Sequence, residues 1–181
     1  ITAGFRAAHG QAVYAWAPFA EDGRSHRWNP LSAIRLADRH VVGDTLAIAQ
    51  VLYPTDVKGS GTEGFFNDTA RNLFLGLARC LVETPELPRT IGEILRQGMA
   101  SDDEGYGAHW KRLIEGRGSG KYPLSPECVR ALCDVIDLAP VTASSIRKTF
   151  TSRLDLWLNP ILDWATSAND FDLRELRSKR I

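Results

Sequence analysis

The sequence predicts a mainly α-helical protein: a compact bundle of about six to seven helices with a strand-like N-terminal flank. Three observations lead to this prediction. Apolar residues recur at helical spacing through residues 43–158, helix-start signals precede several of these runs, and one run is apolar on nearly every side. With 181 residues, of which 44% are hydrophobic and 24% charged, the chain can form one domain with a substantial core.

The N-terminal flank, residues 1–42, contains the best strand candidate. The segment AVYAWAPF at 12–19 is short, rich in aromatic residues and ends at a proline. Two turn signals follow it, Asp-Gly at 22–23 and Asn-Pro at 29–30. We therefore expect a strand and then a loop before the helices begin.

Two helices are predicted in the first part of the helical region. The first covers 44–53, with Asp44 as its N-cap. The second lies in FFNDTARNLFLGLARCLVET at 65–84 and would be capped by Asn67 or Asp68. Because its apolar residues leave only a narrow polar stripe, we expect this helix to lie at the centre of the bundle.

The remaining helices are predicted from their start signals and their spacing. Thr-Ile-Gly-Glu at 90–93 is a capping box that opens a short helix, and Ser-Pro-Glu at 125–127 is a second strong start. A short helix is expected at 108–115, followed by a flexible glycine-rich connection. The last long helix is expected over 141–158, where inward-facing apolar residues recur every four positions up to Leu158.

The charge balance argues against several classes of protein. The whole chain has 22 basic and 22 acidic residues, and residues 43–158 contain 13 basic and 15 acidic ones. A domain that binds phosphates directly should be clearly basic, so we expect little direct DNA binding.

No membrane-spanning helix is predicted. The longest apolar stretch, within 70–82, is interrupted by polar residues, whereas a membrane span needs about 20 mostly apolar residues.

The cysteines and histidines indicate no metal site and no secreted disulfide framework. Cys80, Cys128 and Cys133 are odd in number, and we expect reduced, buried thiols and a cytoplasmic setting. They lack the Cys-x-x-Cys spacing of a zinc site, and the four histidines are far apart in the sequence. We therefore assign no metal-binding residue.

Two glycine-rich segments raise the question of a nucleotide site. KGSGTEGFF at 58–66 lacks a lysine at the position that a phosphate-binding loop requires. GRGSGKY at 116–122 contains Gly-Lys, but Glu115 stands where the first glycine of that loop should be and Tyr122 where a serine or threonine should be. We assign no catalytic residue and no cofactor-binding residue.

The partner-binding surface is predicted in the region 99–122, whose loops are long, glycine-rich and mixed in charge. The acids there could be a solvated loop, a partner contact or a catalytic group, and solvation is the ordinary case for such a cluster. A groove between helices is a common binding site for a peptide. The candidate partner-binding residues are Asp102, Asp103, Glu104, Tyr106 and Trp110, although the helical context of Trp110 favours packing over binding.

Three long stretches of the chain resemble a known family. They are TAGFRAAHGQAVYAWAPFAEDGRSHRWNPL, FFNDTARNLFLGLARCLVETPELPRTIGEILRQ and SSIRKTFTSRLDLWLNPILDWATSANDFDLRELRSKRI. Together, and in this order, they resemble the coupling ATPases of type IV secretion and conjugation systems. The specific motifs are the WNPL turn, the FFNDTARNLF helix start, the TFTSRL helix and the TSANDFDLREL exit.

The resemblance implies a domain organisation. Members of this family are hexameric, membrane-anchored ATPases with an all-α domain inserted in a RecA-like nucleotide-binding domain. Residues 43–158 would be the all-α domain, while 1–42 and 159–181 would be edges of the nucleotide-binding domain in an excised piece of a longer protein. The phosphate-binding loop and the magnesium-linked acid would lie outside the piece. We therefore expect no enzymatic activity and no cofactor here, with ATP and magnesium serving the parent protein.

The resemblance also implies a function and partners. The all-α domain would be a substrate-recognition module that binds secreted effector proteins with a C-terminal signal, or a relaxase, at the cytoplasmic side of the bacterial inner membrane. Other secretion-system components would be further partners. A DNA-contacting domain and a purely structural domain are the alternatives, although the charge balance favours protein recognition. The full-length protein would be a hexamer, and this piece alone is expected to be a soluble monomer.

Overall fold

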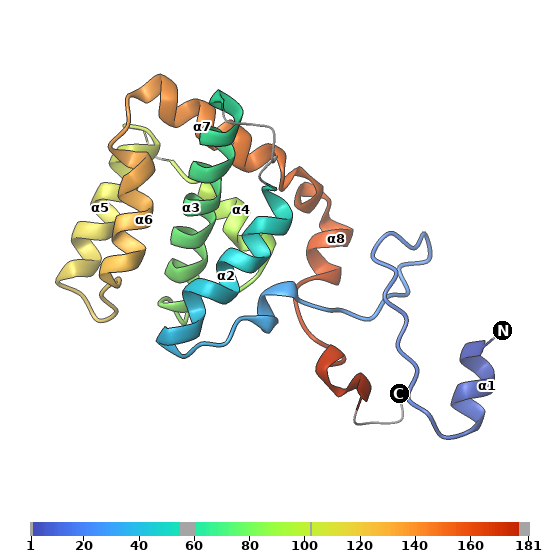
Figure 1. The fold of residues 1–181 in the computed structure, drawn as a ribbon. Helices are drawn as coiled ribbons and strands as arrows, with labels where there is room; N and C mark the ends of the chain where they lie inside the picture. Colours follow the sequence, from blue (N-terminus) through green and yellow to red (C-terminus); the bar gives the residue numbers. More distant parts are fainter. Residues whose placement is uncertain (1, 55–60, 102, 178–181) are drawn as a thin grey trace.

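The computed structural model describes residues 2–54, 61–101 and 103–177, which form eight α-helices, three short 3₁₀ helices (η) and no strand (Figure 1). The mainly α-helical prediction is confirmed. The elements in chain order are α1 (Thr2–Ala8), η1 (Pro30–Ala33), α2 (Asp38–Leu52), α3 (Thr62–Val82), α4 (Ile91–Met99), α5 (Tyr106–Gly118), α6 (Pro126–Ile136), α7 (Pro140–Ser152), η2 (Asp155–Leu158), α8 (Pro160–Ala165) and η3 (Leu173–Arg177).

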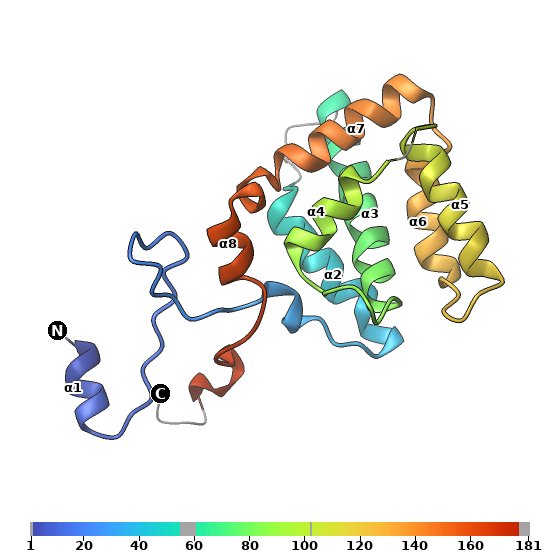
Figure 2. The same cartoon turned by 180° about the vertical axis from the view of Figure 1, so that it is seen from behind.

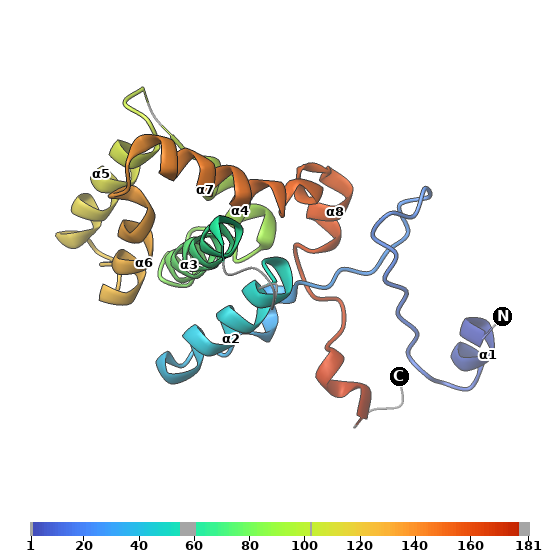
Figure 3. The same ribbon diagram turned by 45° about the horizontal axis from the view of Figure 1, so that its top comes forward.

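Helix α3 is the centre of the bundle, as predicted. Figure 3 looks nearly along its axis and shows α2, α4, α6 and α7 around it, and α3 contacts each of these four helices. Its residues Leu73, Phe74 and Leu77 have no solvent-exposed surface. Burial on several sides explains why the sequence of α3 is apolar nearly all round.

Two predicted helix starts are wrong for related reasons. Helix α3 begins at Thr62, so that Asn67 and Asp68 lie inside it. Helix α2 begins at Asp38, so that Asp44 also lies within a helix, where its carboxylate binds the guanidinium of Arg35 at 2.8 Å. In both cases a residue type that favours N-caps has been used inside a helix, where tertiary partners outweigh local preference.

Two other helix starts are confirmed. The Thr90 hydroxyl accepts a hydrogen bond from the Glu93 backbone N–H at 3.1 Å, and the Ser125 hydroxyl accepts one from the Cys128 N–H at 3.2 Å. The side chain of Glu93 bonds Arg96 instead of closing the capping box. Helices α4 and α6 therefore begin where their sequences predict.

The predicted strand at 12–19 is absent. This segment folds back against residues 25–26: the His26 N–H donates to the Ala15 carbonyl at 2.8 Å, and the Ala17 N–H donates to the Ser25 hydroxyl at 2.9 Å. Only one of these bonds joins two backbone groups, so no ladder of a sheet can form. The flank is a hairpin-like loop, and α1, for which the sequence gives no prediction, precedes it.

The last long helix is shorter than predicted and α5 is longer. Helix α7 ends at Ser152 and η2 follows, which turns Leu158 outward, with 59% of its surface exposed. Helix α5 continues into the glycine-rich segment as far as Gly118, and Arg117 in its last turn donates a 2.8 Å hydrogen bond to the Glu83 carbonyl. The predicted flexible connection thus begins only after α5.

The three thiols are free; Cys80 and Cys128 are buried, as predicted, whereas Cys133 is only partly buried. None of the helices in the described ranges is both long enough and apolar enough to cross a bilayer. Within the same ranges, no three histidine, cysteine or acidic side chains gather as metal ligands would.

Candidate protein-binding surfaces

The two flanks of the chain meet in a neck, which we define as residues 26–29 and 165–170. The Trp28 N–H donates to the Ala165 carbonyl at 2.9 Å, and the Asp170 N–H donates to the Arg27 carbonyl at 3.0 Å. An ion pair of 3.0 Å joins the side chains of Arg27 and Asp170. The flanks therefore leave the helical core side by side, and they lie on the same side of it in two opposite views (Figures 1 and 2).

The neck ion pair makes a prediction about pH. Hydrogen bonds from the Arg27 side chain and backbone, together with its positive charge, lower the pKa of Asp170. The pair should persist above the ordinary carboxyl pKa of about 3.9 and be lost as the pH falls through the lowered value. In an NMR titration from pH 6 to 2, the Arg27 amide, which bonds Asp170 Oδ2, should shift with a midpoint below about 3.9. D170N should abolish the transition, and a midpoint at or above the ordinary value would refute the assignment.

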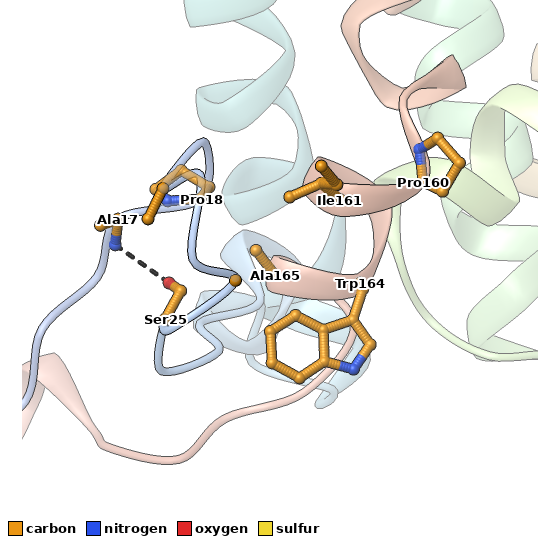
Figure 4. Close-up of a pocket in the computed structure, with 9 residues that line it drawn as sticks. Ala17, Pro18, Ser25, Pro160, Ile161, Trp164 and Ala165 are labelled. Atoms are coloured by element: carbon orange, nitrogen blue, oxygen red, sulfur yellow. Dashed lines mark hydrogen bonds between the residues drawn. The ribbon is translucent and has the colours of Figure 1, made fainter.

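A first cavity lies between the 17–25 loop and α8 (Figure 4). It has a volume of about 300 Å³ and mostly apolar walls. Pro18 approaches it from the loop, while Ile161, Trp164 and Ala165 come from α8. Ile161 and Trp164 are half exposed. We call this cavity the flank pocket.

A second, larger cavity lies on the other side of α8. It is an open groove of about 520 Å³ between α4, η2 and α8, and we call it the α4–α8 groove. Met99 and Leu158 contribute exposed apolar surface, while Arg96 and Asp163 contribute charge. Its lining residues are Gly92, Leu95, Arg96, Met99, Ala100, Ser101, Trp157, Leu158, Pro160 and Asp163.

Across the groove, the side chain of Asp163 on α8 reaches α4. A Cβ atom at Gly92 would lie 1.8 Å from Asp163 Oδ1, so only glycine permits this approach. Arg96 then bridges the two helices, with Nη1 2.8 Å from Asp163 Oδ2 and Nε 2.7 Å from Glu93 Oε2. We call the contact between Arg96 and Asp163 the latch. It fixes one wall of the groove.

The predicted partner-binding residues separate into two groups. Asp103 and Glu104 are exposed, whereas Asp102 lies outside the described residues. Tyr106 is buried, and Trp110 has no exposed surface. The placement of these two aromatic side chains at a binding surface is therefore corrected: they lie four residues apart on the inward face of α5, where they pack against each other and the core.

The groove was only partly foreseen from the sequence. Met99, Ala100 and Ser101 begin the region 99–122 that was predicted to bind a partner. Leu158 was missed, because the helical spacing placed it on an inward face. The apolar run Leu-Trp-Leu at 156–158 is the sequence feature that could have pointed to Leu158 as a groove residue. Such a run does not by itself distinguish a core segment from an exposed one.

Comparison with known proteins adds an independent line of information. The whole chain, residues 1–181, matches the family model described as type IV secretory system conjugative DNA transfer. It is 28% identical over 182 residues to the conjugal transfer protein TraG of Escherichia coli, covering 97% of this chain and 28% of TraG.

Two VirD4 proteins have a similar level of sequence identity to this chain. The chain is 31% identical over 188 residues to VirD4 of Agrobacterium fabrum, and 30% identical over 188 residues to VirD4 of Rhizobium rhizogenes. In both cases 99% of this chain and 25% of VirD4 are covered. The chain thus spans about a quarter of the length of these relatives.

Proposed function

Because the chain belongs to the type IV secretory system conjugative DNA transfer family of coupling proteins, we propose that it is the substrate-recognition module of such a protein. It would bind secreted effector proteins, or a relaxase, at the cytoplasmic side of the bacterial inner membrane and direct them to the secretion channel. ATP hydrolysis with magnesium would belong to a nucleotide-binding domain in a longer polypeptide that assembles as a hexamer. Residues 1–42 and 159–181 would be the edges of that domain.

The observation that carries the proposal is the α4–α8 groove. It is open, it is larger than the flank pocket, and exposed apolar side chains of Met99 and Leu158 flank it. Grooves between helices bind peptides by receiving a few apolar anchors, while polar groups at the rim set orientation. Arg96 and Asp163 provide such polar groups in the wall.

Two exposed acids, Asp103 and Glu104, extend the proposed surface beyond the groove. Asp103 and Glu104 follow closely after Met99, Ala100 and Ser101, and both side chains are exposed. Glu104 approaches Arg112 at 3.7 Å, so part of its charge is balanced within the chain. Rim charges of this kind influence the rate and the specificity of association more than its strength.

Substitution of the apolar anchors tests the proposal. M99D and L158D should each weaken binding of the C-terminal domain of a protein secreted by the same system by about tenfold or more, because each places an unpaired charge at an apolar contact. Isothermal titration calorimetry measures the effect. The matched control is V141D, because Val141 is 80% exposed but lies on α7, outside the groove lining. Unchanged affinity in both groove variants would rule out the groove as the binding site.

A DNA-contacting role is the second candidate, and one feature favours it. Residues 138–154 include no acid and contain three basic residues, Arg147, Lys148 and Arg153. The guanidinium of Arg147 lies 4.0 Å from the centre of the Tyr106 ring, however. Of the three basic residues, only Lys148 and Arg153 are therefore exposed to solvent. Binding of single-stranded DNA that weakens steeply with salt would favour this second candidate over protein recognition.

A further inference from the structure

Helix α8 is a wall of both cavities. Its residue Asp163 lines the α4–α8 groove, whereas Ile161, Trp164 and Ala165 line the flank pocket, and Pro160 lies at the edge of both. Figure 4 shows the second set of side chains directed toward the 17–25 loop. A displacement of α8 would therefore change both cavities together.

The C-terminal end of α8 is also part of the neck. The Ala165 carbonyl accepts the hydrogen bond of the Trp28 N–H, and the Arg27 guanidinium lies 5.6 Å from the centre of the Trp164 ring. The next residue, Thr166, is buried, and its hydroxyl accepts a hydrogen bond from Trp157 Nε1 at 3.0 Å. Helix α8 thus joins the groove, through Trp157 and the latch, to the flanks, through Arg27 and Trp28.

Helix α8 depends on these outside contacts for its position. It has only six residues, a length at which an isolated helix is not stable in water. Leu162 and Ala165 are its buried residues. The latch, the contacts of its C-terminal end with the neck, its packing against η2 and these two side chains therefore determine where it lies.

We propose that α8 couples the α4–α8 groove to the neck, and that the latch between Arg96 and Asp163 is the contact that an occupant of the groove alters. This rests on the proposed function, since it concerns the regulation of the same groove. An occupant that offers its own oxygen acceptor to Arg96 competes with Asp163, frees α8 from α4 and loosens the neck. Coupling of this kind requires one structural element that contacts both sites and can take two positions. We assign that role to α8.

Amide hydrogen exchange of the full 181-residue chain tests the coupling without any ligand. D163N removes the charge of the latch, and G92A displaces Asp163 sterically. In both variants the amides of Trp28 and Asp170 in the neck should exchange about tenfold faster, because local opening of the neck becomes easier. Amides in the middle of α3 should exchange at the wild-type rate.

A matched control and a reciprocal variant complete the test. G116A also adds a methyl group to a helical glycine, but no atom lies within 4 Å of the new Cβ, so the neck amides should be unaffected. R27A perturbs the neck and should accelerate exchange of the Thr166 amide at the end of α8, because coupling acts in both directions.

Two outcomes would overturn the coupling. One is wild-type exchange in the neck of both latch variants. The other is equal acceleration throughout the chain, which would indicate a global loss of stability instead. Neither outcome depends on substrate binding, so the coupling and the proposed function can fail separately.

Discussion

Replacing Phe150 with alanine is expected to lower the free energy of unfolding by about 3–5 kcal/mol. Phe150 has no exposed surface, and its ring stacks on that of Tyr53 with a centroid distance of 6.0 Å. The Tyr53 hydroxyl also donates to the Phe150 carbonyl at 3.0 Å. The substitution removes a large side chain from the junction of α2, α4 and α7, and a cavity would remain.

The tight packing around Phe150 explains why little relaxation is expected. A Cβ atom at Gly98 would lie 2.3 Å from Phe150 Cε1, so α4 already approaches the ring as closely as a glycine allows. Urea denaturation followed by circular dichroism measures the loss. V141A, on the exposed face of the same helix, should change stability by less than about 0.5 kcal/mol. A loss below about 1 kcal/mol for F150A would show that the core collapses onto the vacated space.

Replacing Arg79 with alanine is expected to cost about 3–5 kcal/mol, because it leaves a nearly buried carboxylate without its cation. The side chains of Arg79 and Glu83 are 8% and 17% exposed, and they form an ion pair at 3.1 Å. Arg79 Nη2 also donates to the hydroxyl of Ser125, the N-cap of α6, at 3.0 Å. The substitution therefore weakens the junction between α3 and the start of α6.

A double variant distinguishes the loss of the Arg79–Glu83 ion pair from the effect of leaving the Glu83 carboxylate unpaired. R79M combined with E83L replaces both partners with apolar side chains, and removing a buried pair in this way is often nearly neutral. We expect the double variant to lose less stability in urea denaturation than R79A. A double variant that loses more than R79A would indicate that Glu83 stabilises the fold mainly through its 2.8 Å hydrogen bond from the Ser125 N–H.

The features that the sequence predicts are those with a local or periodic cause. The all-round apolar character of α3 predicts its central position, and Thr90 and Ser125 predict two helix starts through their own hydroxyl groups. Asp44 and Asn67 have the same local signal, yet they lie inside helices. The difference is tertiary: Asp44 meets Arg35, and Asn67 is buried by neighbouring helices.

The candidate site depends on contacts between distant segments, which explains why it was harder to predict. The groove is formed by α4 and α8, and the residues of its latch, Arg96 and Asp163, are far apart in the sequence. Nothing local to Gly92 indicates that its missing side chain makes room for Asp163. Trp110 was named as a partner-binding candidate, and only the orientation of α5 shows that its side chain lies in the core.

The neck has a consequence for how this protein can vary among its relatives. Because residues 26–29 and 165–170 lie side by side, the helical unit between them begins and ends at one place. Helices within such a unit can be lengthened, lost or exchanged while its two ends stay joined by hydrogen bonds. The neck thus allows the helices between its two segments to change while the segments keep their contact.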